Sequence, residues 1–555
     1  MRITLYGFFI FLSFLTIEGS TLDIVYSALS RHQGIIVDNN NLLSIVSTIN
    51  TDDIPSQEIY WKVIIQKRRN NQTWKTIFQN TGTGTSMNAT WNGISSKGKL
   101  LQNKKCRLLL KAKWSNNPLI KDVIEIPFLI NPLEDNLPSG SNAPFIPEAP
   151  AGTATHWVSP LGNNNNPGTQ ALPWRQISYA AQAAQAGYII EILDGTYNSP
   201  IIIGEKNGTE QNPIIFRAAD GNVQVDGSGT SNSGWDQRDA IYIYDSSYIV
   251  IHGLKVYDAY RSGSRVSSST HITIQGCVFG NNGTWGIFTD FSHDLKFLGN
   301  ECFGSKNEHG IYHSNSGDRT IISGNYCHDN RDSGIQINAD PSQGDDGISS
   351  ECVIERNLII RNGIGGGSAI NLASVRNSTI RNNLLYGNRA SGIAMWDDGQ
   401  GIQWGCKNNL IEHNTIVHFS GQGRFALLFW NGSTGNTIRN NILIGGQRGA
   451  ITFTADSLNG IHSNNNLMYI QDGGTLIEEE NSGDSFSLSS WQALTQNDNQ
   501  SINLLPTFIN AAQGDYALAL QSPGLDQGLN SGLANTYTGS SRPQGNGYDI
   551  GAMDN

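Results

Sequence analysis

The chain has 555 residues with a formal net charge of −11, and only 15% of its residues are charged. It contains 61 glycines and 59 asparagines, residue types that favour turns and weaken helices, which excludes a coiled coil and a helical solenoid. The acidic balance also argues against a nucleic-acid-binding protein, because phosphate neutralisation requires clusters of Lys and Arg.

Residues 1–20 have the pattern of a secretory signal peptide. Arg2 precedes an apolar stretch from Ile3 to Ile17, and the small residues Gly19 and Ser20 follow it. The alternative is a membrane anchor, but the apolar stretch is shorter than the ~20 residues that a spanning helix needs. No later stretch is long and apolar enough to span a bilayer. We therefore expect a secreted protein, extracellular or held in the periplasm or at the cell surface.

Residues 21–133 predict a small β-sandwich. Apolar and polar residues alternate over residues 58–66 and 107–114, as in half-buried strands. The segment Ala89-Thr-Trp-Asn-Gly93 resembles the Ig-like repeat of flagellar hook-capping proteins, which implies an Ig-like domain. Residues 134–152 are rich in Pro, Ser, Gly and Ala and predict a linker.

A repeat with steps of 23–32 residues runs through the middle of the chain. Each copy has a strand-like motif that ends in an anchor residue, an apolar residue two positions later, and a second strand of alternating apolar residues. The anchors are Cys277, Asn300, Asn325, Asn357, Asn383, Asn414, Asn441 and Asn465. Short strands without helical stretches at this period predict an all-β fold, a right-handed parallel β-helix of about 8–11 coils over residues 153–480. We expect the anchor asparagines to form a ladder between coils.

The six cysteines are few for a disulfide-stabilised exported protein. Cys302 and Cys327 fall at equivalent inward positions of adjacent coils, about one strand spacing (~4.8 Å) apart. That separation permits a disulfide, but parallel Cβ vectors make bridging awkward. We therefore predict a buried pair of free thiols, with a disulfide as the alternative.

From Trp157 onward the chain resembles secreted β-helix proteins of the pectate-lyase-like superfamily. The resemblance rests on an Asn-rich loop at 163–169, Pro173-Trp174, and Asp194-Gly-Thr-Tyr197, and it continues in the tail with Pro506-Thr-Phe508 and Asp549-Ile-Gly-Ala552. It implies a parallel β-helix whose outer groove binds polysaccharides, a short helix over 177–186 that caps the first coil, and a C-terminal closing segment over 481–555. Lyases, glycoside hydrolases, epimerases and non-catalytic surface proteins all occur among such relatives.

Motifs that we associate with particular enzymes of this superfamily are absent. The chain lacks the Asn-x-Asp-Gly-Phe motif of calcium-dependent pectate lyases and the Gly-His-Gly and Arg-Ile-Lys motifs of polygalacturonases. Asp340-Pro341-Ser342 stands in place of the Asp-Pro-His motif of alginate epimerases. The resemblance therefore indicates the fold more specifically than the reaction.

The densest polar stretch, residues 306–313, is the first candidate site. A lyase needs a cation near the uronate carboxylate, a base for the C5 proton and a proton donor for the leaving oxygen. Lys306, His309 and Arg331 are candidates for the cation or base, and Tyr312, which alternation directs outward, for the donor. Gln336 and Asn338 lie one coil later as substrate-binding candidates. His313 falls at an inward position and is predicted to be a core histidine.

Basic residues recur in the turn before the second strand of each repeat. They are Lys306, Arg331, Arg389, Arg424 and Arg448. Such a basic file along one edge of an acidic protein suits an anionic polymer, and Arg389 is a further substrate-binding candidate. The alternative is that these are ordinary solvated turn residues.

An insertion at 338–347 contains three carboxylates within seven residues, Asp340, Asp345 and Asp346. They are candidate Ca²⁺ ligands, because calcium prefers oxygen ligands. The alternatives are the acid and base of a glycoside hydrolase or an acidic surface loop. Trp396 and Trp430 are predicted to stack outward on adjacent coils, where they would bind sugar rings unless a loop covers them. No organic cofactor is expected.

The function that these features favour is cleavage of an acidic, uronate-containing polysaccharide by β-elimination. A glycoside hydrolase on the same fold is the first alternative, and a non-catalytic carbohydrate-binding or surface protein is the second. We expect a monomer whose partner is an acidic polysaccharide, with no nucleic acid and no membrane span.

Overall fold

The computed structural model describes Phe145 and residues 147–554 fully, and the N-terminal region chiefly through the backbone of its strands. The chain divides into two compact units, Met1–Leu137 and Pro138–Asn555, and the boundary falls within the predicted linker. Among the residues described, no helix is long and apolar enough to cross a bilayer. Of the predicted signal peptide, only Arg2–Thr4 is described, and the rest lies outside the described residues.

The N-terminal unit consists of two antiparallel sheets. The stretches predicted as alternating strands form β5 and β8, which pair with each other, and Trp61, Val63 and Leu109 on them are buried. The Ig-like character of this unit stays a prediction. The larger sheet has the order β3 (Ile35–Ile36), β1 (Arg2–Thr4), β9 (Lys121–Ile130), β8 (Lys104–Trp114), β5 (Ile59–Arg68) and β6 (Trp74–Thr83). The smaller sheet has the order β2 (Leu22–Val25), β4 (Leu43–Thr51) and β7 (Ser86–Trp91).

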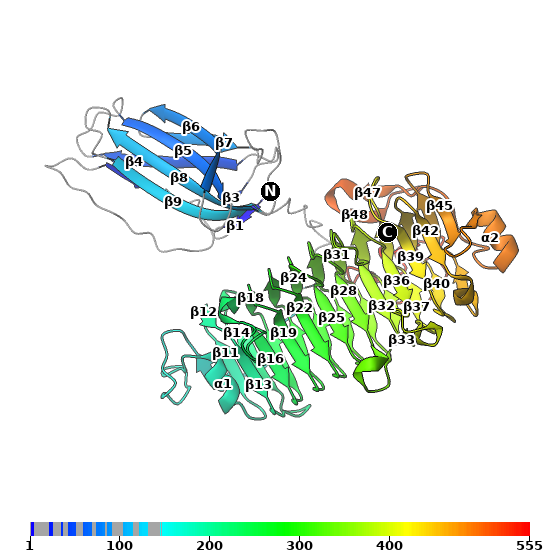
Figure 1. Ribbon diagram of the computed structural model, residues 1–555, viewed down its shortest axis with the longest axis horizontal. Helices are drawn as coiled ribbons and strands as arrows, with labels where there is room; N and C mark the ends of the chain where they lie inside the picture. The colour runs from blue at the N-terminus through cyan, green and yellow to red at the C-terminus, as the bar shows by residue number, and fades with distance from the viewer. Residues whose placement is uncertain are drawn as a thin grey trace. The chain divides into compact units, whose positions relative to one another are not determined.

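The second unit is a parallel β-helix of three long sheets, with one strand of each sheet in every coil (Figure 1). The second sheet has eleven strands and so marks eleven coils, at the upper end of the predicted range. The first sheet comprises β10 (His156–Val158), β11 (Ile189–Ile192), β14 (Ile214–Ala218), β17 (Ile249–His252), β20 (Thr273–Gln275), β23 (Lys296–Leu298), β26 (Ile321–Ser323), β30 (Val353–Glu355), β34 (Thr379–Arg381), β37 (Leu410–Glu412), β40 (Thr437–Arg439) and β43 (His462–Asn464).

The other two sheets follow in the same coil order. The second comprises β12 (Gly195–Asn198), β15 (Val223–Asp226), β18 (Lys255–Tyr257), β21 (Val278–Gly280), β24 (Glu301–Phe303), β27 (Tyr326–His328), β31 (Leu358–Ile360), β35 (Leu384–Tyr386), β38 (Thr415–Val417), β41 (Ile442–Gly445) and β44 (Leu467–Ile470). The third comprises β13 (Ile201–Gly204), β16 (Ile241–Tyr244), β19 (Ser262–Ser267), β22 (Trp285–Asp290), β25 (Ile311–Ser314), β28 (Ile335–Asn338), β32 (Ile370–Ala373), β36 (Ile393–Trp396), β39 (Phe425–Phe429), β42 (Gly449–Phe453), β45 (Thr475–Glu479) and the antiparallel β46 (Ser485–Phe486).

The short helices lie at opposite ends of the β-helix. The helix α1 (Ile177–Ala183), within the range predicted for a capping helix, buries Ile177 and Ala180 against the first coil. The helix α2 (Leu488–Thr495) buries Trp491 at the other end, against Phe453 of β42. Both ends of the stack therefore have helical cover (Figure 1). Two short pairs complete the unit, β29 (Ser349–Ser350) with β33 (Val375–Arg376) and β47 (Phe508–Asn510) with β48 (Asp515–Leu518).

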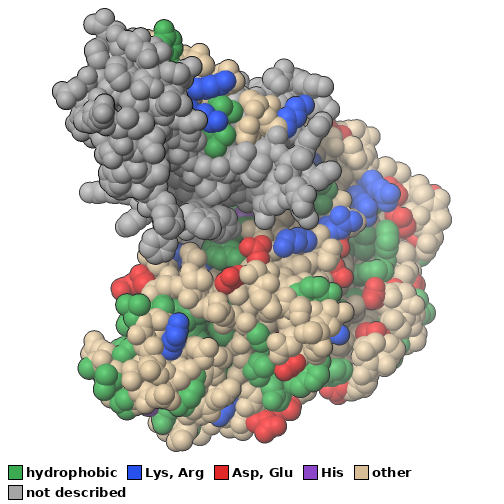
Figure 2. Space-filling model, turned by 60° about the vertical axis from the view of Figure 1, so that its left-hand side comes forward, with side chains coloured by type: hydrophobic (Ala, Val, Ile, Leu, Met, Phe, Trp, Pro, Cys, Tyr) green, Lys and Arg blue, Asp and Glu red, His purple; other side chains and the backbone are tan. Residues whose placement is uncertain are grey.

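The outer side of the first sheet carries ion pairs between adjacent coils. Arg217 contacts Glu191 at 2.7 Å, and Arg381 contacts Glu355 at 2.8 Å. Figure 2 shows a face of the molecule on which basic and acidic side chains lie next to one another. Such pairs neutralise each other locally and contribute little stability each.

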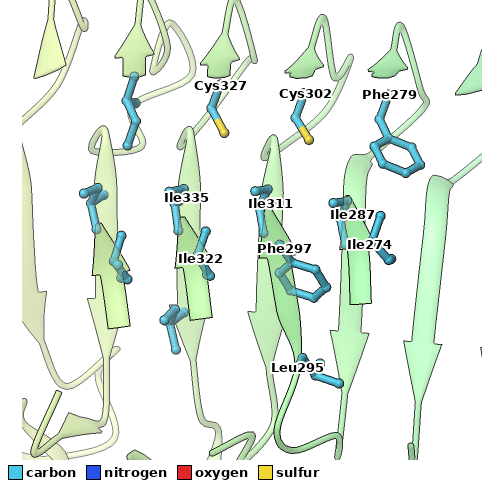
Figure 3. Close-up of a cluster of buried hydrophobic side chains, with 14 of the residues drawn as sticks. Ile274, Phe279, Ile287, Leu295, Phe297, Cys302, Ile311, Ile322, Cys327 and Ile335 are labelled. Carbon is cyan, nitrogen blue, oxygen red and sulfur yellow. The ribbon is translucent and has the colours of Figure 1, made fainter. Parts of the chain in front are cut away.

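The interior is filled by side chains that stack in files along the coils. Phe279, Cys302 and Cys327 form one file on the second sheet, beside Ile311 and Ile335 of the third sheet (Figure 3). All of them are fully buried, and each large aliphatic or aromatic side chain contributes roughly 1.5–3 kcal/mol. Cys302 and Cys327 are unbridged, as predicted.

The predicted asparagine ladder lies at the turn between the first and second sheets. The backbone N–H of Asn300 donates to Oδ1 of Asn325 at 2.9 Å, and the Nδ2 of Asn325 donates to Oδ1 of Asn357 at 3.0 Å. The same pattern continues to Asn441 and ends at Asn466. The prediction of Asn465 as the last anchor, with Leu467 as its inward partner, was therefore wrong by one residue, and Met468 pairs with Leu443 instead. A one-residue slip exchanges the two faces of a strand.

The C-terminal segment runs back along the outer face of the second sheet. That face is apolar from β27 to β44 and includes Leu358 and Leu384, which Tyr516, Leu518 and Ile550 of the tail cover. Residues 481–555, predicted as a closing segment, therefore cover a long side of the β-helix as well as its end. Part of the predicted linker also lies against the β-helix, because the Glu148 carbonyl accepts a hydrogen bond from Gln275 Nε2 at 2.9 Å.

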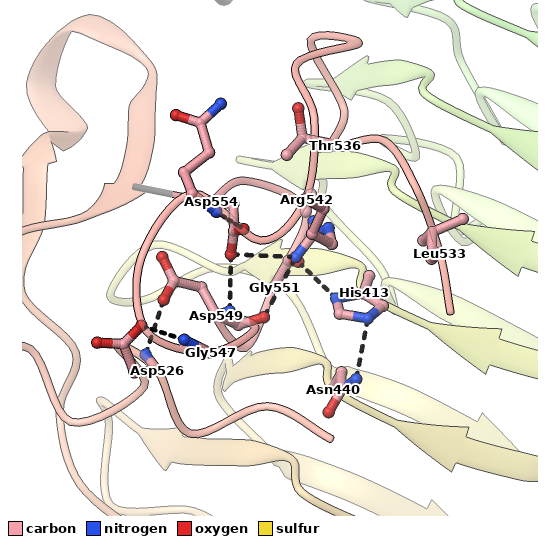
Figure 4. Close-up of polar contacts among 12 residues, drawn as sticks. His413, Asn440, Asp526, Leu533, Thr536, Arg542, Gly547, Asp549, Gly551 and Asp554 are labelled. Carbon is pink, nitrogen blue, oxygen red and sulfur yellow. Dashed lines mark hydrogen bonds and ion pairs between the residues drawn. The ribbon is translucent and has the colours of Figure 1, made fainter. Parts of the chain in front are cut away.

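A buried polar cluster fixes the tail in place (Figure 4). The Arg542 side chain, which is fully buried, lies 3.6 Å from the carboxylate of Asp554 and donates to the Gly551 carbonyl at 3.1 Å. Nδ1 of His413 lies 3.2 Å from that carbonyl oxygen, and its Nε2 contacts Asn440 Nδ2 at 2.9 Å. The tail is thus joined to β-helix residues by hydrogen bonds as well as by apolar contact.

Candidate functional site

The outer face of the third sheet displays two rows of side chains. The alternation that directs Ile311 and His313 inward directs Tyr312 outward, as predicted. Tyr312 has Phe288 and Gln336 as its neighbours on adjacent strands, and Asn371 follows Gln336. The second row contains Asp290, Ser314, Asn338, Ala373 and Trp396. Several predicted site residues therefore share one face.

Tyr312 is packed between side chains of its own coil and the preceding one. The His309 ring meets the Tyr312 ring edge-on at 5.3 Å, and the Trp285 ring lies 5.6 Å away. Burial, together with the nearby charges of Glu308 and Asp398, raises the pKa of Tyr312 to about 12. The phenol therefore stays protonated at neutral and moderately alkaline pH and can donate a proton.

His309 is held as a neutral ring. Its Nδ1 accepts the backbone N–H of Ser333 at 3.1 Å, so its proton lies on Nε2, which is 3.6 Å from Glu308 Oε2. Burial lowers the pKa of His309 to about 3. The arrangement makes His309 a support for Tyr312 and the turn, with neither nitrogen free to act as a base. The geometry therefore does not favour the predicted catalytic role of His309.

Two carboxyl groups lie in the turn beside His309. Glu308 accepts a hydrogen bond from Trp285 Nε1 at 2.9 Å. The backbone N–H of Asp332 donates to the Glu308 carbonyl at 3.0 Å, which places the two residues side by side on adjacent coils. Burial raises the pKa of both carboxyl groups, and the charge of Asp332 contributes to the rise at Glu308. Neither acid was singled out from the sequence.

Asn338 connects the site to the loop after β36. Its Nδ2 donates to Asp398 Oδ2 at 2.8 Å, while its Oδ1 is buried without a hydrogen-bond partner. Burial raises the pKa of Asp398, and the charges of Asp340 and Asp397 act in the same direction. Gln336 accepts a hydrogen bond from Asn371 Nδ2 at 2.7 Å. Asp398 was missed because only Trp396, two positions earlier, was selected from that segment.

The predicted basic file lies along the turn between the second and third sheets. Arg331 N–H bonds to the Ser305 carbonyl, Arg389 N–H to that of Asn362, and Arg424 N–H to that of Ala390, so the file advances coil by coil. All five side chains are exposed. Lys306 lies 3.7 Å from Asp258, whereas the four arginines form no ion pair with any residue that the structure describes. They border the face that carries Tyr312.

The three carboxylates predicted to bind calcium do not converge. Asp340 caps the 3₁₀ turn Pro341–Gln343 by accepting the Ser342 N–H at 2.8 Å. Asp345 accepts the N–H of Asp346, and Asp346 accepts that of Ile348, each at 2.9 Å. Within the described residues, no group of three or more His, Cys, Asp or Glu side chains is arranged to hold a metal ion. The calcium site therefore stays a prediction, and each of the three carboxylates accepts a backbone N–H of its own turn.

Trp396 and Trp430 lie on the same side of the β-helix but do not form the predicted stack. The Trp430 N–H donates to the Met395 carbonyl at 2.9 Å, which places it one coil after Trp396. Both side chains are half-buried, and both indole N–H groups are buried without a partner. No ring contact joins the two within the described part of the chain.

A separate pocket of about 490 Å³ lies at the first coil, between the Asn163–Asn165 loop and β12. Arg175, Gln176 and Tyr197 are among its lining residues. It contains none of the predicted site residues. The chemistry of the site is concentrated on the third sheet instead, so the pocket is not the candidate site.

Comparisons with known proteins agree with this architecture. The family described as right-handed β-helix region matches residues 239–405, and the family described as periplasmic copper-binding protein (NosD) matches residues 347–465. The uncharacterized protein YwoF of Bacillus subtilis is 25% identical over 455 residues, covering 66% of this chain and 91% of YwoF.

Two further similarities are to pectate lyases. Pectate lyase L of Dickeya chrysanthemi is 24% identical over 282 residues, covering 44% of this chain and 63% of that protein, less than two thirds of its length. The crystal structure of pectate lyase Pel9A aligns with a TM-score of 0.50 and 19% identity over 73% of this chain and 97% of that one. The chain is therefore a right-handed parallel β-helix protein with the pectate-lyase-like fold.

Proposed function

We propose that the protein is a secreted lyase that cleaves an acidic polysaccharide by β-elimination at the outer face of the third sheet. The observation that carries this proposal is the position of Tyr312, a half-buried phenol, beside a row of exposed cations, of which the four arginines have no ionic partner among the described residues. The similarity to pectate lyase L supports the same class of reaction.

The cations have two roles in this proposal. Arg331 binds the carboxylate of a uronate residue and stabilises the negative charge that develops when the C5 proton is removed. Lys306, which is exposed and lies on the preceding coil, is the base, and its uncharged amine takes that proton. Arg389 binds a carboxylate farther along the polymer.

Tyr312 completes the elimination. The electrons of the C5–H bond form the C4=C5 double bond, the C4–O bond breaks, and the leaving oxygen takes the Tyr312 proton. A pKa of about 12 keeps this proton on Tyr312 until the leaving group develops charge. In this proposal Asn338 and Asp398, which are joined by a hydrogen bond of 2.8 Å, bind sugar hydroxyl groups.

The test is an assay of purified protein with pectate, alginate and glycosaminoglycans, each with calcium and with a chelator. We expect ultraviolet absorbance from unsaturated products. Tyr312→Phe should lower kcat by roughly 10²–10⁴-fold, as loss of a general acid does. Tyr179→Phe, which alters a tyrosine on α1, is the matched control. Activity that survives Tyr312→Phe, Lys306→Ala and Arg331→Ala would contradict the assignment.

A glycoside hydrolase is the second candidate, because Glu308 and Asp332 form a pair of neighbouring carboxyl groups with raised pKa. Such pairs serve as acid and base in hydrolysis. In the same assay, hydrolysis produces reducing ends without ultraviolet absorbance and is abolished by Glu308→Gln. Binding without either product indicates a non-catalytic carbohydrate-binding protein.

A further inference from the structure

A row of aromatic side chains occupies the third sheet on the N-terminal side of Tyr312. Tyr242 and Tyr244 project from β16, and Trp235, in the loop before that strand, meets their rings edge-on at 5.5 and 5.8 Å. Two coils later Trp285 stacks on Phe288 at 4.3 Å, and Phe288 lies 5.5 Å from Tyr312. These six aromatic residues, with Arg265 between them, form the aromatic row: Trp235, Tyr242, Tyr244, Arg265, Trp285, Phe288 and Tyr312.

Arg265 joins the two halves of the aromatic row. Its guanidinium carbon lies 5.0 Å from the Tyr242 ring centre and 5.6 Å from that of Phe288. The same guanidinium pairs with Asp290 on the next coil. Arg265 Nε and Asp290 Oδ1 are both buried and lack hydrogen-bond partners. The row therefore combines aromatic faces with polar atoms whose hydrogen-bonding capacity is unused.

The aromatic row is more than an extension of the core, because part of it faces solvent. Trp235 is 57% exposed, whereas Tyr242 and Phe288 are buried beneath it and Arg265. By contrast, the apolar outer face of the second sheet is covered by the tail. Exposed aromatic groups on an otherwise polar face suit the apolar faces of sugar rings.

We propose that the aromatic row is a second binding region for the same polysaccharide chain, in which pyranose rings stack on the exposed Trp235 and on the half-buried Tyr244 and Trp285. This inference rests on the proposed function, since it places the chain on the same face. Strands β16 to β25 are three spacings of ~4.8 Å apart, or roughly 14 Å, room for a few successive sugar rings.

The two binding regions differ in physical character. The basic file begins at Lys306, in the turn before β25, and continues toward the C-terminal coils, whereas the aromatic row extends from Tyr312 toward the N-terminal coils. Contacts of exposed cations with carboxylates weaken as salt rises, whereas ring stacking does not depend on charge. Tyr312 lies where the two regions meet, so the bond to be cleaved has a charged region on one side and an aromatic region on the other.

The experiment measures binding and cleavage of oligogalacturonates and oligoalginates of increasing length, at low and high salt. Trp235→Ala should weaken the calorimetric affinity for long oligosaccharides roughly twofold to tenfold at both salt concentrations, the loss expected for one aromatic contact. It should leave kcat/KM for the shortest cleaved substrate unchanged. Trp235→Phe should restore part of the affinity. Tyr179→Ala removes a partly exposed aromatic ring on α1 and is the matched control, while Arg389→Ala should weaken binding only at low salt.

The outcomes separate this inference from the proposed function. If Trp235→Ala cleaves the substrates and binds long oligosaccharides with wild-type affinity, the inference is overturned and the proposed lyase stays intact. If the protein binds the oligosaccharides without cleaving them, and Trp235→Ala weakens that binding, the inference is supported and the lyase is overturned. A loss in Trp235→Ala that disappears at high salt also overturns the inference, because stacking would then not be its cause. No binding of either polymer by the wild-type protein overturns both.

Discussion

The outer faces of the second and third sheets arise from the same alternation of side chains but carry different residues. The second sheet displays Leu358, Leu384 and Ile442, and the C-terminal segment covers them. The third sheet displays Tyr312, Gln336 and Asn338 next to exposed cations. The difference shows how one coil can serve two purposes: an apolar outer face binds another part of the chain, whereas a polar and aromatic face remains able to bind a ligand.

The largest expected effect comes from breaking the contacts of the covered face. Arg542→Ala leaves the carboxylate of Asp554 buried without its cation, which should destabilise the protein by about 3–5 kcal/mol. Thermal unfolding should show a lower Tm, and proteolysis should cleave first within residues 506–554. Arg424→Ala, on the open face, is the control and should change stability by less than about 0.5 kcal/mol. Equal stability of the two variants would show that the buried cluster does not hold the tail.

A smaller loss is expected when the ladder between coils is interrupted. Asn383→Ala removes the Oδ1 that accepts both the N–H and the Nδ2 of Asn357, at 3.0 and 2.9 Å. Leaving buried donors unsatisfied costs about 1–3 kcal/mol. Urea unfolding checks the loss, and faster amide exchange at Asn357 should accompany it. Asn307→Ala, in an exposed turn on the open side, should be nearly neutral, and a comparable loss there would refute the special role of the ladder.

The stability of the protein should depend on pH through two histidines, whose contributions change in opposite directions. Burial lowers the pKa of His313, inside the third sheet, from 6.5 to about 4. In the folded protein His313 binds fewer protons than it does in the unfolded chain. Its contribution to stability is therefore complete above about pH 6.5 and falls as pH drops toward 4. Burial also opposes the charge of His328 on the second sheet, but hydrogen bonds to Asp329 and Glu301 raise its pKa overall. The contribution of His328 to stability is complete below about pH 6.5 and is lost as pH rises through the pKa of the folded state.

Measurements of stability against pH should separate the two. His313→Gln should flatten the loss of stability between pH 6.5 and 4, and His328→Gln should flatten the loss on the alkaline side of pH 6.5. Parallel curves for both variants and the wild-type protein would show that neither histidine is coupled to folding.

Much of the β-helix was predictable because its repeat is a local pattern. The spacing of Ile311, Ile335 and Ile370 reports the coil directly, since residues that stack must recur at each turn. The same reasoning failed at Asn465 and Asn466, where two adjacent asparagines fit the motif and only the register distinguishes them. The course of the tail was not predictable, because its contacts with the second sheet have no periodic spacing.

The candidate site was predictable only in part. Tyr312 and Asn338 were found because alternation within a strand determines which side chains face outward. Asp398 reaches Asn338 from a loop sixty residues later in the chain, a contact that no spacing rule anticipates. The aromatic row was missed because the repeat was aligned only from Cys277 onward, although the Ile-Tyr-Ile-Tyr segment at 241–244 shows the same alternation. Asp340, Asp345 and Asp346 are close in sequence, but each caps its own turn.

The most direct test of the central claim is hydrogen exchange of the full chain with and without acidic oligosaccharides. The amides of β16–β28 and of the turn that carries Lys306 and Arg331 should be protected on binding, because the ligand lies on the third sheet. Residues 506–554, which cover the second sheet, should exchange as before. Protection confined to the tail, or spread equally over both faces, would contradict the assignment of the third sheet as the functional face.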